Sequence, residues 1–214
     1  MKASIIIPMY NAEKTIIETI ESTLAQTHRD TEILVVNDSS TDKCREIALS
    51  YRPWITVIDE SSVNTGHPAR PRNTGALLSN GEFLLFLDAD DIILPNYLES
   101  TIPLMDLRAG VVATSMKRFG VQNDLIHPGV SSVTINNMPV CALIRRKAFL
   151  DVDGYDPSIT HEDWDLWLRI GKTRWETRFF REPLFHYRTS LTGLNAQRDV
   201  EADKWREQIR RRHA

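Results

Sequence analysis

The sequence contains little cysteine and no long apolar run. Its 214 residues include two cysteines, Cys44 and Cys141, which are too few for a disulfide framework or a cysteine zinc site. We therefore expect two buried thiols in a reducing compartment. No apolar run reaches the roughly 18 residues that a membrane-spanning helix requires. The apolar stretch at residues 5–7 is too short for a signal peptide, so we expect a cytoplasmic protein.

Basic excess, internal repeats and linker-like segments are also absent. The 26 Lys and Arg residues face 29 Asp and Glu residues, which gives a formal net charge of −3. This balance excludes the global positive field that nucleic-acid-binding proteins usually have. No segment rich in Gly, Ser or Pro divides the chain, so a single domain over residues 1–214 is the simplest partition.

The first half of the sequence alternates strand and helix signals. Short apolar runs predict strands at residues 4–7, 32–36, 55–58 and 83–87, with helices between them. Asn11 is the expected N-cap of the first helix. This order predicts a mostly parallel sheet with helices on both faces. Ligands of such sheets bind beyond the carboxyl ends of the strands, which selects residues 8–11, 37–42 and 88–91.

The second half is less regular. Strands are predicted at residues 111–116, 140–144 and 184–188, and a helix is predicted at 163–170. We expect Trp164, Trp167 and Leu168 on one side of that helix. The charged segment 198–213 has helical spacing and forms a C-terminal tail.

Three carboxylates follow the apolar strand 83–87. Asp88, Asp90 and Asp91 repel one another unless a cation or a hydrogen-bond donor compensates their charge. Mg²⁺ and Mn²⁺ prefer carboxylate and phosphate oxygens. The pattern favours a divalent cation held partly by the protein and partly by a ligand's phosphates, against the alternative of a solvated acidic loop.

Polar residues after the first two strands have two interpretations. Tyr10 could stack on a base, and Asp38 could accept hydrogen bonds from a base or a ribose. Alternatively, Pro8 only forms a turn before the helix cap Asn11, and Asp38 only caps the helix that starts near Asp42.

Two charged segments are further candidates. Arg72 lies in the basic, proline-stiffened loop 67–73, and its planar donors suit a diphosphate; the alternative is an exposed surface loop. Asp163, at a predicted helix start, could take a proton from an attacking hydroxyl as a general base. The alternative is that acids there only complement the helix dipole.

Five segments in this order resemble glycosyltransferase family 2, whose members are nucleotide-sugar-dependent enzymes of the GT-A fold. They are residues 4–11, 33–42, 71–75, 81–91 and 162–169, and the resemblance covers residues 1–190. It implies a small antiparallel acceptor-side section beside the parallel sheet. Residues 1–110 would then bind the nucleotide sugar, residues 111–190 would face the acceptor, and residues 191–214 would form a helical tail.

The resemblance also implies roles for single residues. Asp163 would be the catalytic base, and Asp90, with Asp88, would form the metal-binding D-x-D motif for Mg²⁺ or Mn²⁺. The nucleotide would be bound by Pro8, Tyr10, Asn11, Asp38, Arg72, Asp88 and Ala89. The implied activity is transfer of a hexose from a nucleoside diphosphate, usually UDP, to an acceptor hydroxyl with inversion. Saccharides or lipid-linked saccharides in polysaccharide biosynthesis are the implied acceptors.

The sequence departs from the family pattern at two places. Asn37 precedes Asp38 where relatives usually have two acids, and Ser190 stands where many relatives have a histidine. A third metal ligand therefore stays open, with His186 as a substitute or as a structural residue.

Other interpretations are weaker. A nucleotidyltransferase would have a Gly-rich loop after the first strand, and an aspartyl-nucleophile phosphohydrolase would have its D-x-D there. A non-catalytic nucleotide-sugar-binding protein would not need the acids Asp88, Asp90 and Asp163.

The basic tail also has two interpretations. Trp205 and the arginines 210–212 could contact an anionic membrane surface, which would place the protein on the inner face of the membrane. Alternatively, the tail packs on the domain or pairs two copies as a homodimer. We expect acceptor specificity to depend on residues 115–140 and on the tail.

Overall fold

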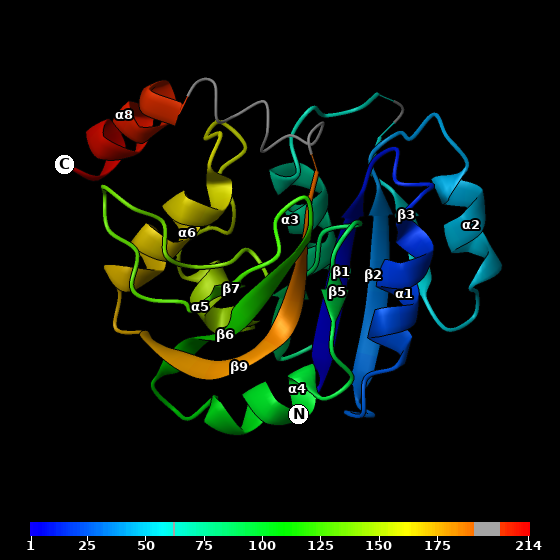
Figure 1. Cartoon of the computed structure of the whole chain (residues 1–214), viewed down its shortest axis with the longest axis horizontal. Coiled ribbons are helices and arrows are strands. Elements are labelled where there is room, and N and C mark those ends of the chain that lie inside the picture. Colours follow the sequence, from blue (N-terminus) through cyan, green and yellow to red (C-terminus); the bar gives the residue numbers. More distant parts are fainter. Residues whose placement is uncertain (62, 191–201) are drawn as a thin grey trace.

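A curved sheet flanked by helices runs through the computed structural model, which describes residues 1–61, 63–190 and 202–214 (Figure 1). Within these residues the sheet has nine strands. Their order is β3-β2-β1-β4-β8-β6-β9-β5, and β7 pairs with β6. The first four strands in this order are parallel and come from the N-terminal half of the chain.

The parallel half has the four predicted strands. They are β1 (Ala3–Met9), β2 (Thr31–Asn37), β3 (Thr56–Asp59) and β4 (Phe83–Phe86). The helices between them are α1 (Ile16–Leu24), α2 (Cys44–Ser50) and α3 (Ala69–Leu78). β1 and β4 are buried along their whole length, as expected for strands covered on both faces.

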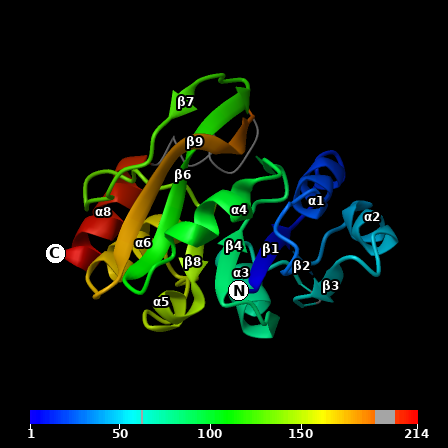
Figure 2. The same ribbon diagram turned by 90° about the horizontal axis from the view of Figure 1, so that it is seen from below.

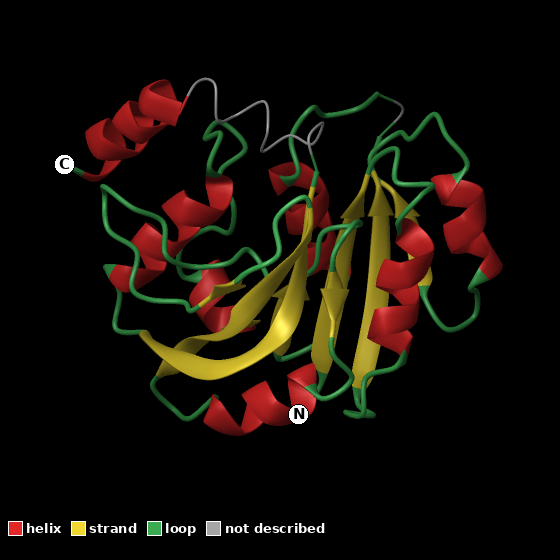
Figure 3. Ribbon diagram, viewed as in Figure 1, coloured by secondary structure: helices red, strands yellow, loops and turns green. Residues whose placement is uncertain are grey.

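The second half of the sheet is mixed. β8 (Ala142–Arg145) runs antiparallel to β4 and to β6 (Ala109–Gly120), whereas β9 (Glu176–Thr189) runs parallel to β6. β6 and β9 are long and strongly bent (Figure 3). The short strands β5 (Ile92–Ile93) and β7 (Leu125–Ile126) pair with β9 and β6. This half provides the predicted small antiparallel section.

Alternate residues of the strands form two cores on opposite faces of the sheet. Ile5 and Ile7 pack with Ile16 of α1 and Cys44 of α2, whereas Ile6 packs on the other face with Ala76 of α3. Both cysteines are buried free thiols, as predicted. The first face is also covered by α4 (Tyr97–Thr101), which continues into a 3₁₀ turn (Ile102–Leu104). The second is covered by α5 (Arg146–Leu150) and α6 (Glu162–Gly171), and Figure 2 shows α3 and α5 opposite α1 and α4.

Three local predictions are wrong. Asn11 does not cap α1, because the helix begins five residues later; Asn11 has a left-handed φ of 48°, and its side-chain oxygen accepts from the Thr41 N–H at 2.8 Å. α3 begins at Ala69, so Arg72 lies in a helix and not in a loop. Trp164 and Trp167 also do not share one side of α6: Trp167 packs toward the sheet, while Trp164 packs with the C-terminal helix.

The C-terminal helix α8 (Ala202–His213) packs on the domain. Ile209 is fully buried against Trp164, and Arg212 lies 2.6 Å from Asp165 and 2.8 Å from Asp156. The predicted packing of the tail on the domain is therefore present, although residues 198–201 lie outside the described part. Among the residues that the structure describes, no helix is long and apolar enough to cross a membrane.

Gly75 allows α3 to approach β1 closely. A Cβ atom at this position would lie 2.3 Å from Cγ2 of Ile6 and 3.2 Å from Cγ2 of Val36. We expect Gly75→Ala to destabilise the fold by about 1–3 kcal/mol, because overpacking outweighs the roughly 1 kcal/mol helix preference of Ala. Urea unfolding measures this change. Leu77→Ala, at an exposed position of the same helix, is the control, and equal stability of the two variants would contradict this packing.

Candidate active site

The loops that follow β1, β2 and β4 meet at one edge of the parallel sheet. The Asn11 N–H donates to Oγ of Ser40 at 3.1 Å, and the Asp38 N–H donates to the Met9 carbonyl at 2.8 Å. Oγ1 of Thr15 donates to the Ala89 carbonyl at 2.9 Å, which joins the third loop to the start of α1. All three predicted ligand-binding segments are therefore neighbours.

Asp38 is buried beneath the segment that precedes α3. Its carboxylate accepts from the Thr65 N–H at 3.0 Å, from the Thr65 hydroxyl at 2.7 Å and from the Asn64 amide at 3.2 Å. Asp38 does not cap α2, since the Cys44 N–H at the start of that helix bonds to Asp42. The contact between Asp38 and a base stays a prediction, and its observed contacts hold segment 63–67 over the strand ends.

Tyr10 is the exposed aromatic residue at this edge. Its side chain is 49% exposed directly after β1, whereas Pro8 is buried within the strand. The side-chain oxygen of Asn11 accepts a hydrogen bond from Thr41 in the neighbouring loop. The geometry therefore leaves the Tyr10 ring accessible to a planar ligand, and the nucleotide-binding roles of all three residues stay predictions.

The three aspartates after β4 have different environments. Asp90 faces solvent, yet the surrounding protein atoms and then the charge of Asp88 raise its pKa to about 6. Asp91 is fully buried, and burial followed by the charges of Asp90 and Asp88 raises its pKa well above the usual range. The backbone N–H of Arg188 donates to Asp91 at 2.7 Å. Asp91 thus anchors β9, whereas Asp88 pairs with Arg72 and Asp90 is exposed.

Arg72 occupies the centre of the site below Asp88. The residue is only 2% exposed, and Nη2 and Nη1 lie 2.5 Å from carboxylate oxygens of Asp88 and Glu162, respectively. Its guanidinium carbon lies 5.3 Å from the ring centroid of Tyr155. A buried guanidinium requires such partners. The predicted direct contact between Arg72 and a diphosphate stays a prediction.

Asp163 lies in the first turn of α6. Trp164 and Trp167 are both buried, but only Trp167 packs toward the sheet, whereas Trp164 packs with α8. The Asn136 amide donates to Oδ2 of Asp163 at 3.1 Å. Burial, and then the charges of Asp163, Glu162 and Asp88 against that of Arg72, raise the pKa of Tyr155 well above its usual range. The charges of these carboxylates therefore all act on one buried phenol.

The donor set suits a hard cation only in part. Asp88 and Asp90 offer carboxylate oxygens, and the pKa of Asp90 is raised first by the surrounding protein atoms and then by the negative charge of Asp88, which a cation would compensate. Among the described residues, no group of three or more His, Cys, Asp and Glu side chains could hold a metal ion. His186 therefore forms no such group with the two aspartates, and its ring centroid lies 6.4 Å from that of Phe119. A cation here would take its other ligands from a diphosphate and water.

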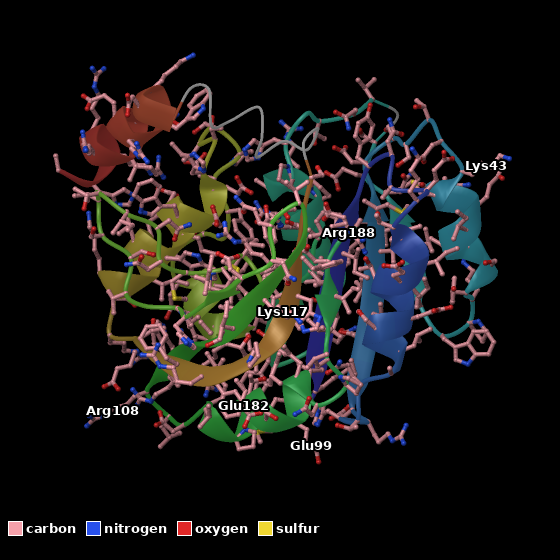
Figure 4. All side chains as sticks on the ribbon, in the orientation of Figure 1. Lys43, Glu99, Arg108, Lys117, Glu182 and Arg188 are labelled. Carbon is pink, nitrogen blue, oxygen red and sulfur yellow. The ribbon has the colours of Figure 1, made fainter. Side chains whose placement is uncertain are left out.

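Several residues of the site were not predicted from the sequence. Glu162 and Tyr155 pack around Arg72, and Asn136 contacts Asp163. Arg188, labelled in Figure 4 at the end of β9, donates from Nε to the Asp90 carbonyl at 2.8 Å and pairs with Glu18. The acidic run 162–165 was a signal for Glu162, but it does not indicate which acid is buried.

Asp90 should reduce stability when it is ionised. Its folded-state pKa of about 6 lies above the ordinary value of 3.8, so the unfavourable free energy is complete above pH 6 and is lost as the pH falls toward 4. Without metal, we expect Asp90→Asn to stabilise the protein at pH 8 by about 1 kcal/mol, allowing for solvent screening. Thermal melts in chelator at pH 8 and pH 4 measure this difference, and a gain that is equal at both pH values would contradict it.

Comparisons with known proteins agree with the geometry. The family model for glycosyl transferase family 2 matches residues 4–160. A poly(ribitol-phosphate) beta-glucosyltransferase of Bacillus spizizenii is 42% identical over 44% of this chain and 15% of its own length. Staphylococcus aureus TarS, a poly(ribitol-phosphate) beta-N-acetylglucosaminyltransferase, is 34% identical over 64% of this chain and 25% of its own length. The chain thus spans about a quarter or less of these two relatives.

One relative is covered over most of its length, and two solved structures share the fold. Escherichia coli WfaP, a UDP-Glc:alpha-D-GlcNAc-diphosphoundecaprenol beta-1,3-glucosyltransferase, is 31% identical over 78% of this chain and 69% of its own length. TarS 1–349 with UDP-GlcNAc has a TM-score of 0.72 at 24% identity, covering 89% of this chain and 59% of that one. Pyrobaculum calidifontis PcManGT with GDP-Man and Mn²⁺ has a TM-score of 0.75 at 17% identity, covering 94% and 61%. The predicted GT-A fold is confirmed, and the chain belongs to glycosyl transferase family 2.

Proposed function

We propose that this chain is an inverting glycosyltransferase that moves a sugar from a UDP-sugar to an acceptor hydroxyl. One observation carries the proposal: Arg72 joins Asp88, at the end of a parallel strand, to the start of the helix that holds Asp163. This arrangement brings a candidate cation-binding pair and a candidate base to one edge of the sheet. The named activities of TarS and WfaP support the same reaction class.

The strand ends supply a donor pocket in this proposal. The Tyr10 ring is accessible for stacking on the base, and Asp38 fixes segment 63–67 beside it. Pro8 lies near the end of β1, Asn11 shapes the loop after it, and the backbone of Ala89 borders the donor where the D-x-D segment contacts the start of α1. The UDP-GlcNAc complex of TarS, with the same fold, supports UDP as the nucleotide.

Asp90, with Asp88, would hold Mg²⁺ or Mn²⁺, which neutralises charge on the departing diphosphate when it is bound. Asp163 would remove the proton of the acceptor hydroxyl as the oxygen forms its bond to the anomeric carbon and the bond to the diphosphate oxygen breaks. A single displacement of this kind inverts the configuration. The Asn136 amide orients the Asp163 carboxylate by donating to Oδ2.

We further propose a saccharide or lipid-linked acceptor that carries phosphate. The named acceptors of the relatives are poly(ribitol-phosphate) and a diphosphoundecaprenol-linked sugar. The segment around Asn136, which contacts Asp163, exposes Val130, Val133 and Ile135 and suits the acceptor side. A cytoplasmic location, peripheral membrane contact and homodimer formation stay predictions.

Asp163→Asn should bind the donor but lose transfer. The amide has nearly the same shape as the carboxylate, but it cannot accept the proton, so we expect kcat to fall by about 10²–10⁴-fold. UDP release from a panel of UDP-sugars with undecaprenyl-diphosphate saccharide acceptors measures turnover, and calorimetry measures UDP binding. Near-normal turnover of this variant would remove Asp163 as the base.

Asp90→Ala should weaken Mn²⁺-dependent UDP binding by more than about tenfold, because the exposed carboxylate next to Asp88 is lost. Calorimetric titration of UDP with Mn²⁺, repeated in chelator with the wild type, measures the effect. Glu99→Ala is the control, since Glu99 lies on α4 at the lower edge of the molecule in Figure 4, well below Arg188. Unchanged UDP affinity of Asp90→Ala in Mn²⁺ would refute the metal assignment.

A further inference from the structure

A buried carboxylate beside the proposed base has no role in the reaction described above. Glu162, the first residue of α6, is 3% exposed, and a carboxylate in such a position requires a cation or donors beside it. Oε1 lies 2.5 Å from Nη1 of Arg72, and Oε2 lies 3.5 Å from Nε2 of His67. Glu162 thus contacts both α3 and the segment before it.

Arg72 extends this contact to the donor side. Its Nη2 lies 2.5 Å from Asp88, and the Tyr155 ring packs over its guanidinium. The loop that contains Tyr155 is in turn fixed to α3, because Asn73 exchanges two hydrogen bonds with the Tyr155 backbone at 2.8 and 3.0 Å. The guanidinium is therefore held from several sides, with one carboxylate from the loop after β4 and one from the start of α6.

Stability alone does not account for this arrangement. Desolvation offsets much of the attraction within a buried ion pair, so such pairs contribute little net stability. Two carboxylates also share one guanidinium here, and the pair of Arg72 and Asp88 would remain without the charge of Glu162. The carboxylate of Glu162 adds a second contact, which fixes the groups around Arg72 relative to one another.

We propose that Glu162 is a positioning residue that acts through Arg72. It holds the first turn of α6, and with it Asp163, at a fixed position relative to Asp88 and the donor. This inference rests on the proposed function, because transfer requires the base and the donor to be aligned. A displacement of about 1 Å at a reacting group lowers a rate roughly 10²-fold. Loss of Glu162 should therefore affect kcat more than donor binding.

Steady-state kinetics of Glu162→Gln test the consequence for the reaction. We expect kcat to fall about 10–100-fold while the KM for the donor stays within about threefold. Glu162→Asp, which keeps the charge on a shorter side chain, should recover part of kcat. Because the effect acts through Arg72, the double variant with Arg72→Lys should be no slower than the slower single variant. Multiplied losses in the double variant would overturn the inference.

Asp165→Asn provides a matched control on the same helix. Asp165 is also fully buried and paired with arginines, at 2.7 Å from Arg169 of the same helix and 2.6 Å from Arg212 of α8, and neither contact is with Arg72. We expect this variant to melt at a lower temperature while kcat stays within about twofold. A loss of kcat in Asp165→Asn equal to that in Glu162→Gln would show that any buried charge of α6 has this effect, and it would overturn the inference.

Hydrogen exchange tests the contact without requiring turnover. In Glu162→Gln, the amides of the first turns of α6 should exchange faster than in the wild type, while those of β1 should not change. If the wild type transfers no sugar from any donor, the proposed function fails, yet this exchange measurement still decides whether Glu162 fixes α6. Unchanged exchange in α6 would overturn the positioning role, and Glu162→Asp gives the same comparison if Glu162→Gln does not fold.

Discussion

One buried arginine side chain joins the two halves of this molecule at its candidate active site. The guanidinium of Arg72 lies between Asp88, which follows the parallel strand β4, and Glu162, which begins α6. A buried guanidinium without partners is very unfavourable, so neither carboxylate can move away unless another group replaces it. The parallel half of the sheet and helix α6 therefore share one fixed point, which lies between the segments that carry Asp90 and Asp163.

The site carries more negative than positive charge around this point. Arg72 is shared by two carboxylates, and the Arg188 guanidinium is paired with Glu18 of α1. Asp90 is left beside Asp88 with its pKa raised to about 6. An excess of carboxylates attracts a divalent cation more strongly than a balanced site does. The formal net charge of −3 is thus unevenly distributed over the molecule.

The sequence predicted the parallel half and the main acids of the site, because buried strands are short apolar runs and the chain turns at polar residues. It did not predict that Arg72 is buried, since its partner Glu162 lies 90 residues away. Asn11 has the composition of a helix cap, but a contact with Thr41 in the next loop determines its conformation. β9 was predicted too short because its burial is irregular, without a period of two. Long-range contacts thus determine the burial of Arg72 and the conformation of Asn11, which local sequence patterns do not predict.

The pairing of β5 with β9 has a consequence for the order in which this protein can fold during synthesis. Ile92 pairs with His186, and Arg188 donates to Asp91, so the segment directly after the D-x-D motif is completed by residues made almost a hundred positions later. The four parallel strands can assemble while the ribosome is still adding the second half, because their contacts lie within the first 90 residues. The edge that carries Asp90 and Asp91, in contrast, reaches its final form only when β9 has emerged.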